Sequence, residues 1–509
     1  MKSLTTHNNT ITSFFMPLIF DYIAIFFALL GTIPVWASLY QFFMIGIHGI
    51  KNHYKHTAAY MPRVAIIVPA WNEGDVIGNT IEHLLSMDYP KHALRVYVVD
   101  DASTDHTPDV VKEKHEQYPD NVFHLRREKG GQGKAHTLNH GINIILEENW
   151  AEALLIIDAD VLFEKNALRL MTRHLADKNV GSVTAYIKEG SAPGNFISKF
   201  IAFEYITAQA ASRRAQNVMG SLACLAGGAQ LHSRENLLAI GGKIDTSSLA
   251  EDTFTTFKTQ LNGRKAVFDG NATVWAEEPG SVVAIWKQRL RWARGNVQVT
   301  KAFKHIWLNK KNGKKLGSFS FSLLWFAILL MPVFMILSSI GLIWLFFSNF
   351  SESWLLFKQL WIVNAFTYLF VTIYSLIIDK QTAKKAWLQG VLFPGIISLT
   401  IIVLSCFPAA IDDFIHFVNG MTQADLGLTQ KIIVLFMYAW ASLCMLFAYW
   451  AYIADKNKKP YWLSLTLLLI SGFGALLCTI TLYSYIMEYK KAELKWDKTQ
   501  KSGKVVIAG

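Results

Sequence analysis

The chain has 509 residues, of which 52% are apolar and 17% are charged, and its net charge is +11. This composition excludes a low-complexity protein, and it is more apolar than that of an ordinary soluble enzyme. The basic residues gather beside apolar stretches, as in KNHYKH (51–56) and DKQTAKKAW (379–387), a bias typical of cytoplasmic membrane loops. We therefore expect the positive charge to face membrane lipids and not nucleic acid. The four cysteines form no CxxC pair, so neither a disulfide framework nor a zinc site is predicted.

Long apolar runs with few charges flank a more polar middle, and about 20 apolar residues suffice to cross a bilayer. Residues 1–50 are predicted to be an uncleaved membrane anchor with one span near 23–49. Residues 317–487 are predicted to be a transmembrane bundle, with candidate spans at 318–347, 355–378, 388–411, 432–454 and 462–487. The tail 488–509 carries six lysines and is predicted to be cytoplasmic.

The number of crossings stays open at this point. Five spans after a cytoplasmic domain would place the tail outside, which contradicts its lysines. Segment 388–411 is the candidate for a re-entrant or interfacial path, because Pro394 and Pro408 bracket it and proline removes backbone hydrogen-bond donors. The loop 412–431 argues the other way, since it is acidic and has no lysine before Lys431.

Residues 51–280 alternate strand-like and helix-like segments and are predicted to form one α/β catalytic domain inserted between transmembrane helices. The apolar spacing predicts a helix over 74–87. Apolar strands that alternate with helices predict a mostly parallel sheet covered on both faces, with ligands at the carboxyl ends of the strands. The predicted strands are 64–70, 95–100, 122–126, 154–158, 180–187 and 265–269.

Two acidic pairs end apolar strands in a chain that is poor in charge. Asp100 and Asp101 close RVYVVDD, whereas Asp158 and Asp160 close LLIIDAD. One such pair could cap a helix or end a strand in solvent, but two pairs at the same edge of one sheet favour a ligand crevice. Carboxylates one residue apart suit Mg²⁺ or Mn²⁺, which also bind substrate phosphates.

Three further segments offer groups for the same ligand. Lys134 in KGGQGKAHTLNHG (129–141) offers a cation for phosphates, although the glycine run departs from the P-loop pattern. Asp252 is either a helix cap or a general base that takes the proton from an attacking hydroxyl. Residues 281–316 are predicted to be amphipathic interface helices, and Trp292 within them is either an interfacial anchor or a platform for a sugar ring.

Six short motifs follow one another in order: VPAWNE (68–73), VVDDAS (98–103), GKAHTLN (133–139), DAD (158–160), AED (250–252) and QRLRW (288–292). This order resembles that of the processive family 2 glycosyltransferases, which include the synthases of poly-N-acetylglucosamine, hyaluronan, chitin and cellulose. The resemblance implies a GT-A fold and transfer from a UDP-sugar with inversion at the anomeric carbon. The QRLRWARGN stretch looks closest to the poly-N-acetylglucosamine branch and favours UDP-N-acetylglucosamine.

The resemblance also implies roles for single residues. These are nucleotide binding for Glu73, Asp100, Asp101, Lys134 and Asp158, metal binding for Asp158 and Asp160, base catalysis for Asp252, and binding of the diphosphate and the acceptor sugar for Gln288, Arg291 and Trp292. The chain departs from the family pattern where Ala250 replaces a threonine and Phe163 replaces a histidine beside the metal. The stretch KWDKT (495–499) is similar to the gating segment of some members.

The resemblance implies a multi-pass protein of the inner (plasma) membrane with a cytoplasmic catalytic domain. Its expected partners are the UDP-sugar donor, a growing polysaccharide or a lipid acceptor, membrane lipids and a small accessory membrane subunit. Two alternatives remain within the same fold, namely a non-processive enzyme that adds one sugar to a membrane lipid and a synthase that uses UDP-glucose. A third is a membrane transporter or scaffold whose soluble domain only binds nucleotide.

Overall fold

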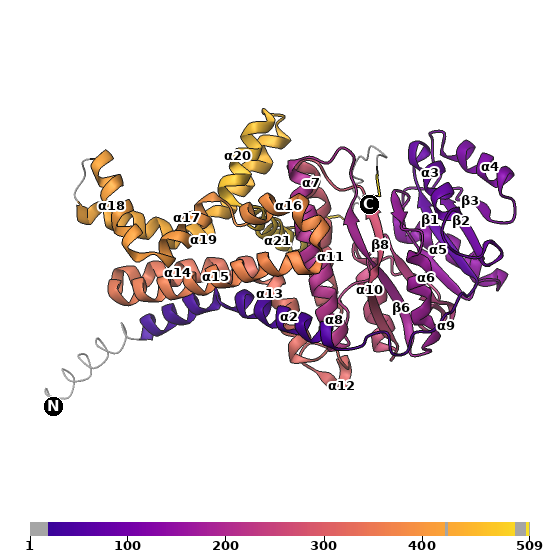
Figure 1. Cartoon of the computed structure of the whole chain (residues 1–509), viewed down its shortest axis with the longest axis horizontal. Helices are drawn as coiled ribbons and strands as arrows, with labels where there is room; N and C mark the ends of the chain where they lie inside the picture. The colour runs from indigo at the N-terminus through magenta and orange to yellow at the C-terminus, as the bar shows by residue number, and fades with distance from the viewer. Residues whose placement is uncertain (1–18, 423–425, 494–504, 508–509) are drawn as a thin grey trace. The chain divides into compact units, whose positions relative to one another are not determined.

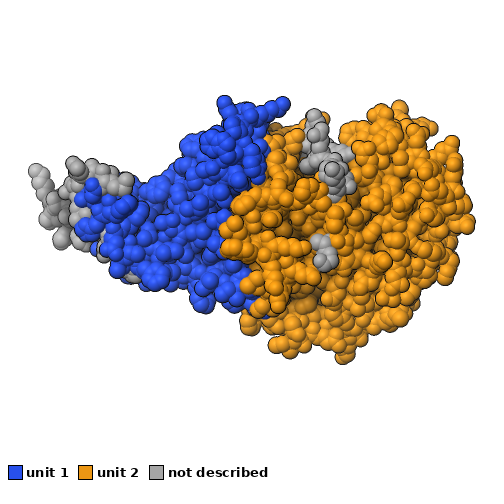
Figure 2. Space-filling model, turned by 45° about the horizontal axis from the view of Figure 1, so that its top comes forward, with its two compact units in different colours: residues 1–40, 326–374, 390–483 blue, residues 41–325, 375–389, 484–509 orange. Residues whose placement is uncertain are grey.

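The computed structural model describes residues 19–422, 426–493 and 505–507 (Figure 1). The chain divides into two compact units, which Figure 2 colours separately. Unit 1 comprises residues 1–40, 326–374 and 390–483, and unit 2 comprises residues 41–325, 375–389 and 484–509. The sheet and all the predicted site residues therefore belong to unit 2, whereas unit 1 consists of apolar helices.

Unit 2 is built on one eight-stranded sheet with the order β3-β2-β1-β4-β7-β6-β8-β5. The half from β3 to β4 is parallel, whereas β7 and β5 run antiparallel to their neighbours. The predicted α/β fold is confirmed. The sheet is more mixed than expected, because β5 and β7, which are too short to be predicted from the sequence, run antiparallel to their neighbours. The strands are β1 Val64–Ala70, β2 Leu94–Asp100, β3 Val122–Arg126, β4 Ala153–Ile156, β5 Val161–Phe163, β6 Val180–Glu189, β7 Gln230–Ser233 and β8 Lys265–Ala276.

Strand register brings the two acidic pairs to one edge of the sheet. Ala70, the last residue of β1, lies opposite Asp100, the last residue of β2. On the other side of β1, Ile67 lies opposite Ile156, the last residue of β4. Because these three strands are parallel, Asp158 follows at the same edge as Asp100, as the sequence predicts.

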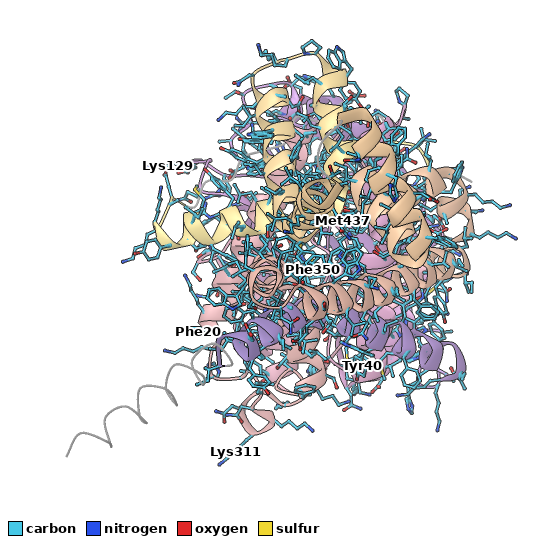
Figure 3. The ribbon with its side chains drawn as sticks, turned by 90° about the vertical axis from the view of Figure 1, so that its left-hand side faces the viewer. Phe20, Tyr40, Lys129, Lys311, Phe350 and Met437 are labelled. Atoms are coloured by element: carbon cyan, nitrogen blue, oxygen red, sulfur yellow. The ribbon has the colours of Figure 1, made fainter. Side chains whose placement is uncertain are left out.

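The helices that surround the sheet position the loops at this edge. Helix α5 packs on β1 and β2 and shares a core with them that includes Ile67, Val99, Leu138 and Ile142. The helices of this domain are α3 Gly74–Leu85, α4 Thr107–Gln117, α5 Lys134–Glu148, α6 Ala167–Thr172, α7 Phe196–Glu204, α8 Ser212–Met219, α9 Arg234–Ala239, α10 Glu251–Leu261, α11 Val282–Ala302 and α12 Lys310–Gly313. Exposed basic side chains such as Lys129 and Lys311 lie at the outside of this unit (Figure 3).

A second apolar core fixes α10 against α11. Phe254 and Phe257 of α10 pack with Phe303 and Phe321, and the ring centres of Phe257 and Phe303 are 5.2 Å apart. A Cβ at Gly295 of α11 would lie 2.6 Å from the Cβ of Ala250, so only glycine permits this close approach. The packing brings the basic helix α11 to the acidic start of α10.

Apolar helices make up unit 1 and the segments that continue from it. Among the described residues, four helices are long and apolar enough to cross a membrane, or up to six if each of two bent pairs is one span. These helices mark a membrane-associated protein. They are the stretch Ile19–Ile50, which contains α2 Ile33–Ile50, and the helices α13 Phe319–Leu329, α14 Met331–Ser348, α15 Phe350–Ile378, α16 Lys380–Leu392, α17 Ile396–Cys406, α18 Pro408–Thr422, α19 Leu426–Lys456, α20 Tyr461–Ser471 and α21 Phe473–Tyr489.

Three predicted spans are interrupted. The segment 318–347 is two helices, since α13 ends at Leu329 and α14 begins at Met331 with Pro332 in its first turn, where proline is tolerated. The suspected segment 388–411 contains a bend of 78° between α16 and α17. A bend of 92° between α20 and α21 interrupts 462–487, which the sequence analysis treats as one continuous span.

The two bends meet at a pair of glycines. Gly395 and Gly472 have positive φ values of 87° and 95°. A Cβ at Gly395 would lie 2.5 Å from the backbone nitrogen of Gly472, and a Cβ at Gly472 would lie 2.4 Å from the carbonyl carbon of Pro394. The backbones of the two breaks therefore touch, and neither position has room for a side chain.

The C-terminal tail returns to the sheet domain. The backbone nitrogen of Val506 donates to the carbonyl oxygen of Gly190 at 2.9 Å, and Val505 forms a bridge with Ser191. The KWDKT stretch, with its expected gating role, lies outside the described residues.

Candidate active site

Asp100, the first residue of the first acidic pair, is held by the loop that leads into α4 and by β3. The Asp100 carboxylate is fully buried and accepts a hydrogen bond from the backbone of Ser103 at 2.8 Å. Burial opposes its charge, but contacts with His124, Ser103 and Arg126 keep the pKa of Asp100 below its usual range. Asp100 therefore stays ionised and is engaged inside the fold.

Asp101 points to the other side of this turn. Its carboxylate pairs with the Arg127 guanidinium and accepts a hydrogen bond from the backbone of Gly131 at 2.9 Å. A Cβ at Gly130 would lie 2.0 Å from the carbonyl oxygen of Asp101, so the glycine run lets this loop lie against the strand end. The loop thus connects Asp101 to Lys134, which begins α5.

Lys134 lies at the centre of an acidic cluster. Its Nζ is 2.5 Å from Oδ1 of Asp158 and 3.9 Å from Oε1 of Glu251, and it donates to the carbonyl oxygen of Gly227 at 3.3 Å. Burial opposes the charge of Lys134, but Asp158 and Glu251 outweigh it and raise its pKa. The lysine is therefore a permanent cation at the edge of the sheet.

Asp252 joins the same cluster from the first turn of α10. Its Oδ1 accepts a hydrogen bond from the backbone of Thr253 at 2.7 Å. A Cβ placed on Gly227 would be 3.5 Å from both Asp252 Oδ2 and Lys134 Nζ, so the glycine leaves room beside both groups. The cap role that the sequence leaves open is not seen, since Ala250 is the residue before the helix and Asp252 lies within its first turn. This leaves the second Asp252 oxygen facing the glycine turn.

Glu251 precedes Asp252 and is only 5% exposed. Burial and the neighbouring Asp252 raise the pKa of Glu251 to about 7. Glu251 therefore holds its proton to a higher pH than an ordinary glutamate does. Glu251 was not predicted as a site residue, although its place directly before Asp252 is the signal that could have indicated a role.

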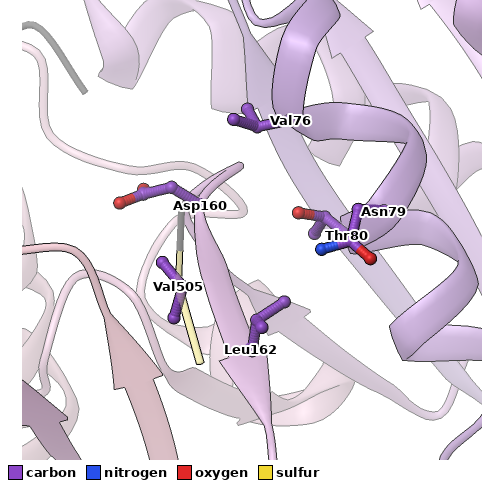
Figure 4. A pocket seen from close by; sticks show the side chains of 6 residues that line it. All are labelled: Val76, Asn79, Thr80, Asp160, Leu162 and Val505. Atoms are coloured by element: carbon purple, nitrogen blue, oxygen red, sulfur yellow. The ribbon is translucent and has the colours of Figure 1, made fainter. Parts of the chain in front are cut away.

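Asp160 lies in a small pocket between β5 and α3 (Figure 4). It is 6% exposed, and Val76, Thr80 and Val505 line the same pocket. The Thr80 hydroxyl donates to the carbonyl oxygen of Ala159 at 2.6 Å and fixes the turn between the two aspartates. This turn sets the direction of the predicted metal ligands.

The donor set at Asp158 and Asp160 fits one mode of metal binding. Among the described residues there is no group of three or more His, Cys, Asp or Glu side chains that could hold a metal ion. Mg²⁺ commonly binds through one or two carboxylates together with substrate phosphates and water. The two aspartates supply such carboxylates, so a metal here would depend on the nucleotide for its remaining ligands.

Helix α11 brings the predicted acceptor residues to this cluster. Burial lowers the pKa of Arg291, and the charges of Glu251, Asp158 and Asp252 oppose that effect, so Arg291 is near enough to these acids to interact with them electrostatically. Gln288 donates from Nε2 to Oε2 of Glu278 at 3.2 Å. Arg294, one turn beyond Arg291, is tied by Nε to Glu488 Oε1 at 2.6 Å, which anchors the helix to the start of the tail.

The structure groups nine of the ten predicted residues in three places, and Asp160 lies in its own pocket beside α3. Lys134, Asp158, Asp252 and Arg291 form the central cluster. Asp100, Asp101 and Glu73 border it, with the Glu73 backbone nitrogen bonded to the Thr107 hydroxyl at 2.8 Å. Gln288 and Trp292 lie along α11, and Trp292 is 37% exposed.

Several residues that contact these groups were not predicted from the sequence, and of these only Arg289 lies inside a motif, QRLRW. Cys224 is close to Asp252, and burial together with Asp252 raises the pKa of its thiol well above the usual range. Glu204, Glu278 and Arg289 surround the predicted acceptor residues. Glu204 is 85 residues from Arg289 and Glu278 lies just before α11, and their contacts with α11 are revealed only by the fold.

Comparisons with known proteins identify the domain. Residues 62–295 match the glycosyltransferase-like family 2. The probable glycosyltransferase YdaM of Bacillus subtilis is 28% identical over 377 residues, which cover 71% of this chain and 87% of that protein. A β-monoglucosyldiacylglycerol synthase of Synechocystis is 29% identical over 237 residues. A poly-β-1,6-N-acetyl-D-glucosamine synthase of Staphylococcus aureus is 25% identical over 237 residues.

The last two relatives are matched over only part of their length. The alignments cover 47% of this chain and 48% of the Synechocystis protein, and 46% of this chain and 55% of the Staphylococcus aureus protein. Among solved structures, the mannosyltransferase PcManGT of Pyrobaculum calidifontis, in complex with GDP-Man and Mn²⁺, has a TM-score of 0.52 and 24% identity. That likeness covers 64% of this chain and 86% of the mannosyltransferase, and it shows a shared fold.

These matches fall on the segment that contains the acidic cluster, and they confirm the expected GT-A fold and the expectation of an enzyme. The chain therefore carries a glycosyltransferase family 2 domain over residues 62–295, and the protein is a glycosyltransferase of the hexosyltransferase class.

Proposed function

We propose that the protein is a membrane-bound inverting β-glycosyltransferase that polymerises a UDP-sugar into an exported polysaccharide. The proposed donor is UDP-N-acetylglucosamine. The observation that carries the proposal is the convergence of Lys134, Asp158, Asp252 and Arg291 at the carboxyl edge of three parallel strands. Transfer from a nucleoside diphosphate sugar requires a base that takes the acceptor proton and cations that stabilise the charge on the diphosphate. This cluster supplies both.

In this reaction the acceptor hydroxyl loses its proton to Asp252 and its oxygen attacks the anomeric carbon of the donor. The bond between that carbon and the diphosphate oxygen breaks, and UDP leaves with the bonding electrons. Lys134 and Arg291 stabilise the negative charge that develops on the diphosphate. Asp158 and Asp160 would hold Mg²⁺ or Mn²⁺, which when bound neutralises diphosphate charge.

Nucleotide binding is proposed for the border of the cluster. Asp101 and Gly131 lie at the end of β2 and on the loop before Lys134, so a nucleoside placed there would have its phosphates over Lys134. The proposed orientation puts this domain in the cytoplasm, where nucleotide sugars are made available, and the apolar helices in the inner membrane. The lysine-rich tail and the basic loops favour that orientation.

The donor and the polymeric product are supported by the Staphylococcus aureus relative, which is named as a poly-β-1,6-N-acetyl-D-glucosamine synthase. The Synechocystis relative, named as a β-monoglucosyldiacylglycerol synthase and of similar identity, favours the second candidate. In that case the protein adds one sugar to a membrane lipid with the same cluster of residues.

Product analysis tests the proposal. The purified protein in lipid vesicles is incubated with Mn²⁺ and labelled UDP-N-acetylglucosamine, UDP-glucose, UDP-glucuronic acid or UDP-galactose in turn. We expect label from UDP-N-acetylglucosamine in a material that is retained on a gel and digested by a β-hexosaminidase. A single labelled glycolipid would contradict polymer synthesis and establish the second candidate, and the same experiment with UDP-glucose would identify a glucose-using synthase.

A further inference from the structure

Trp292, the predicted acceptor platform, is held by a buried ion pair. Arg289 precedes it by one helical turn on α11 and is 5% exposed. Its guanidinium carbon lies 4.0 Å from the centre of the Trp292 ring, within the range of a cation–π contact. Its Nη2 lies 2.8 Å from Oε2 of Glu204, the last residue of α7, which is 9% exposed.

The next residue after Glu204 holds the other acceptor residue. The Tyr205 hydroxyl donates to Oε1 of Glu278 at 2.6 Å, and Oε2 of Glu278 accepts from Gln288 at 3.2 Å. Tyr205 also lies under the Arg289 guanidinium, 5.5 Å from its carbon. Glu204 thus reaches Trp292 through Arg289, and Tyr205 reaches Gln288 through Glu278, with Tyr205 also against Arg289.

The backbone around Glu204 changes from an α-helix to a π-helix. The segment Tyr205–Ala211 is π-helical and joins α7 to α8. A π-helical insertion is rare and shifts the side chains that follow it relative to those before it, and such insertions are frequent at functional sites. Here it lets consecutive residues, Glu204 and Tyr205, both reach α11.

Stability alone is a weak reason for this ion pair. Desolvation of two charges offsets most of their attraction, and apolar residues of similar size often replace a buried pair without loss. In addition, Nε and Nη1 of Arg289 are buried and have no hydrogen-bond partner in the part of the chain that the structure describes. What an apolar residue would not provide is a flat cation fixed against one face of an aromatic ring.

We propose that Glu204 and Arg289 are positioning residues that fix the orientation of the Trp292 ring and thereby determine how the enzyme binds its acceptor sugar. The inference rests on the proposed function for the identity of the acceptor. Donor binding depends on the cluster around Lys134 and not on this pair. Donor binding and acceptor binding can therefore be measured separately.

The first test measures the ring itself and needs no turnover. Full-length protein in vesicles is exposed to hydroxyl radicals, and oxidation of Trp292 and of Trp307 is measured by mass spectrometry. In E204Q and R289M we expect oxidation of Trp292 to rise about twofold or more, because the guanidinium no longer covers the ring. Trp307, in the aromatic core with Phe257, should not change. Unchanged Trp292 oxidation in both variants would overturn the proposal.

The second test separates acceptor from donor. UDP release from UDP-N-acetylglucosamine is measured without acceptor and with a β-1,6-linked N-acetylglucosamine tetramer. We expect the KM for the tetramer to rise about tenfold in E204Q and R289M, and the KM for the donor to stay within twofold. The double variant should be no worse than R289M, since Glu204 acts through Arg289.

Matched controls make the outcomes distinct. E235Q removes the carboxylate of an exposed ion pair with Arg264 (3.1 Å) in the same domain and should match the wild type in both tests. If donor binding, tetramer binding and the protection of Trp307 all weaken equally, the role of the pair is purely structural and the proposal is overturned.

If R289M does not fold, the results for E204Q test the proposal alone, because this change keeps the size of the side chain. A wild type that does not use UDP-N-acetylglucosamine would refute the proposed donor while the oxidation of Trp292 still tests the positioning role.

Discussion

The Nζ of Lys134 lies 2.5 Å from Oδ1 of Asp158, and this contact joins the start of α5 to the end of β4. The two residues are 24 positions apart and belong to different motifs, and each is held in place by the opposite charge of the other. Arg291 adds a second cation beside the same acids. The enzyme therefore has its cations fixed where the diphosphate of a donor is expected, which limits reorganisation during the reaction.

Replacement of Lys134 by methionine should weaken donor binding and stability together. Asp158 is 38% exposed, so losing its contact with Lys134 should cost more than the loss of an exposed pair, about 1 kcal/mol, and less than that of a fully buried one, about 3–5 kcal/mol. We expect the KM for the UDP-sugar to rise at least tenfold and the Tm to fall. The double variant K134M/D158N should recover most of the Tm but none of the donor affinity. K265M, at an exposed pair with Asp177, is the control, and an unchanged KM in K134M would exclude Lys134 from the donor site.

Replacement of Asp252 by asparagine tests the base. The variant keeps the shape of the side chain but cannot take a proton, so we expect UDP release with acceptor to fall by about 10²-fold or more. The KM for the donor should change little. D120N, at an exposed aspartate of the same domain, serves as control. Turnover equal to that of the wild type would remove Asp252 from the mechanism.

Replacement of Asp160 by alanine tests the metal site. Wild-type activity should be lost in EDTA and restored by Mn²⁺, whereas D160A should stay inactive with Mn²⁺ present. A second readout is the binding of Mn²⁺ followed by electron paramagnetic resonance. We expect binding only when UDP is added, since the nucleotide completes the ligand set. Activity that persists in EDTA would show that the assignment of the metal to Asp158 and Asp160 is wrong.

The sheet edge could be predicted because local signals and the fold agree there. Apolar runs mark β1, β2 and β4, and the parallel order places Asp100 and Asp158 at one edge. The short strands β5 and β7 were not predicted, since three or four residues carry too little periodicity to distinguish them from loops. Their pairing depends on tertiary contacts and not on local preference.

The acceptor side of the site shows a different limit. The QRLRW motif identifies Gln288, Arg291 and Trp292, but it does not show that Arg289 covers the Trp292 ring or that Glu204 pairs with it. Glu204 is 85 residues from Arg289 in the chain. Contacts of that kind arise from the packing of α7 on α11, for which one sequence contains no signal.

The raised pKa of Glu251 predicts a dependence of stability on pH. An ordinary glutamate ionises near pH 4.3, whereas the folded protein keeps the proton of Glu251 up to about pH 7. Below the first value both states are protonated and the stability is fully present. Between the two values only the unfolded state releases the proton, so stability falls as the pH rises, by on the order of 3 kcal/mol in total.

Replacement of Glu251 by glutamine should remove this dependence. We expect E251Q to have the same Tm as the wild type at pH 5 and a higher Tm at pH 8, as measured by thermal unfolding in detergent. E235Q, at an exposed glutamate, should follow the wild type at both values. A difference between E251Q and the wild type that is the same at pH 5 and pH 8 would show that Glu251 does not titrate in this range.

Replacement of Gly395 or Gly472 by alanine tests the crossing of the two broken helices. Positive φ costs a non-glycine residue about 1–2 kcal/mol, and the added Cβ would also meet backbone atoms at 2.5 Å or 2.4 Å that cannot move aside without separating the helices. We expect a lower Tm for each variant, together with increased access of a thiol reagent to a cysteine placed beside the break. G420A in α18 is the control, because a Cβ there has no atom within 4 Å and alanine favours a helix. Since both glycines belong to one contact, the double variant should lose less than the sum of the single losses. Fully additive losses would mean that each glycine serves only its own bend.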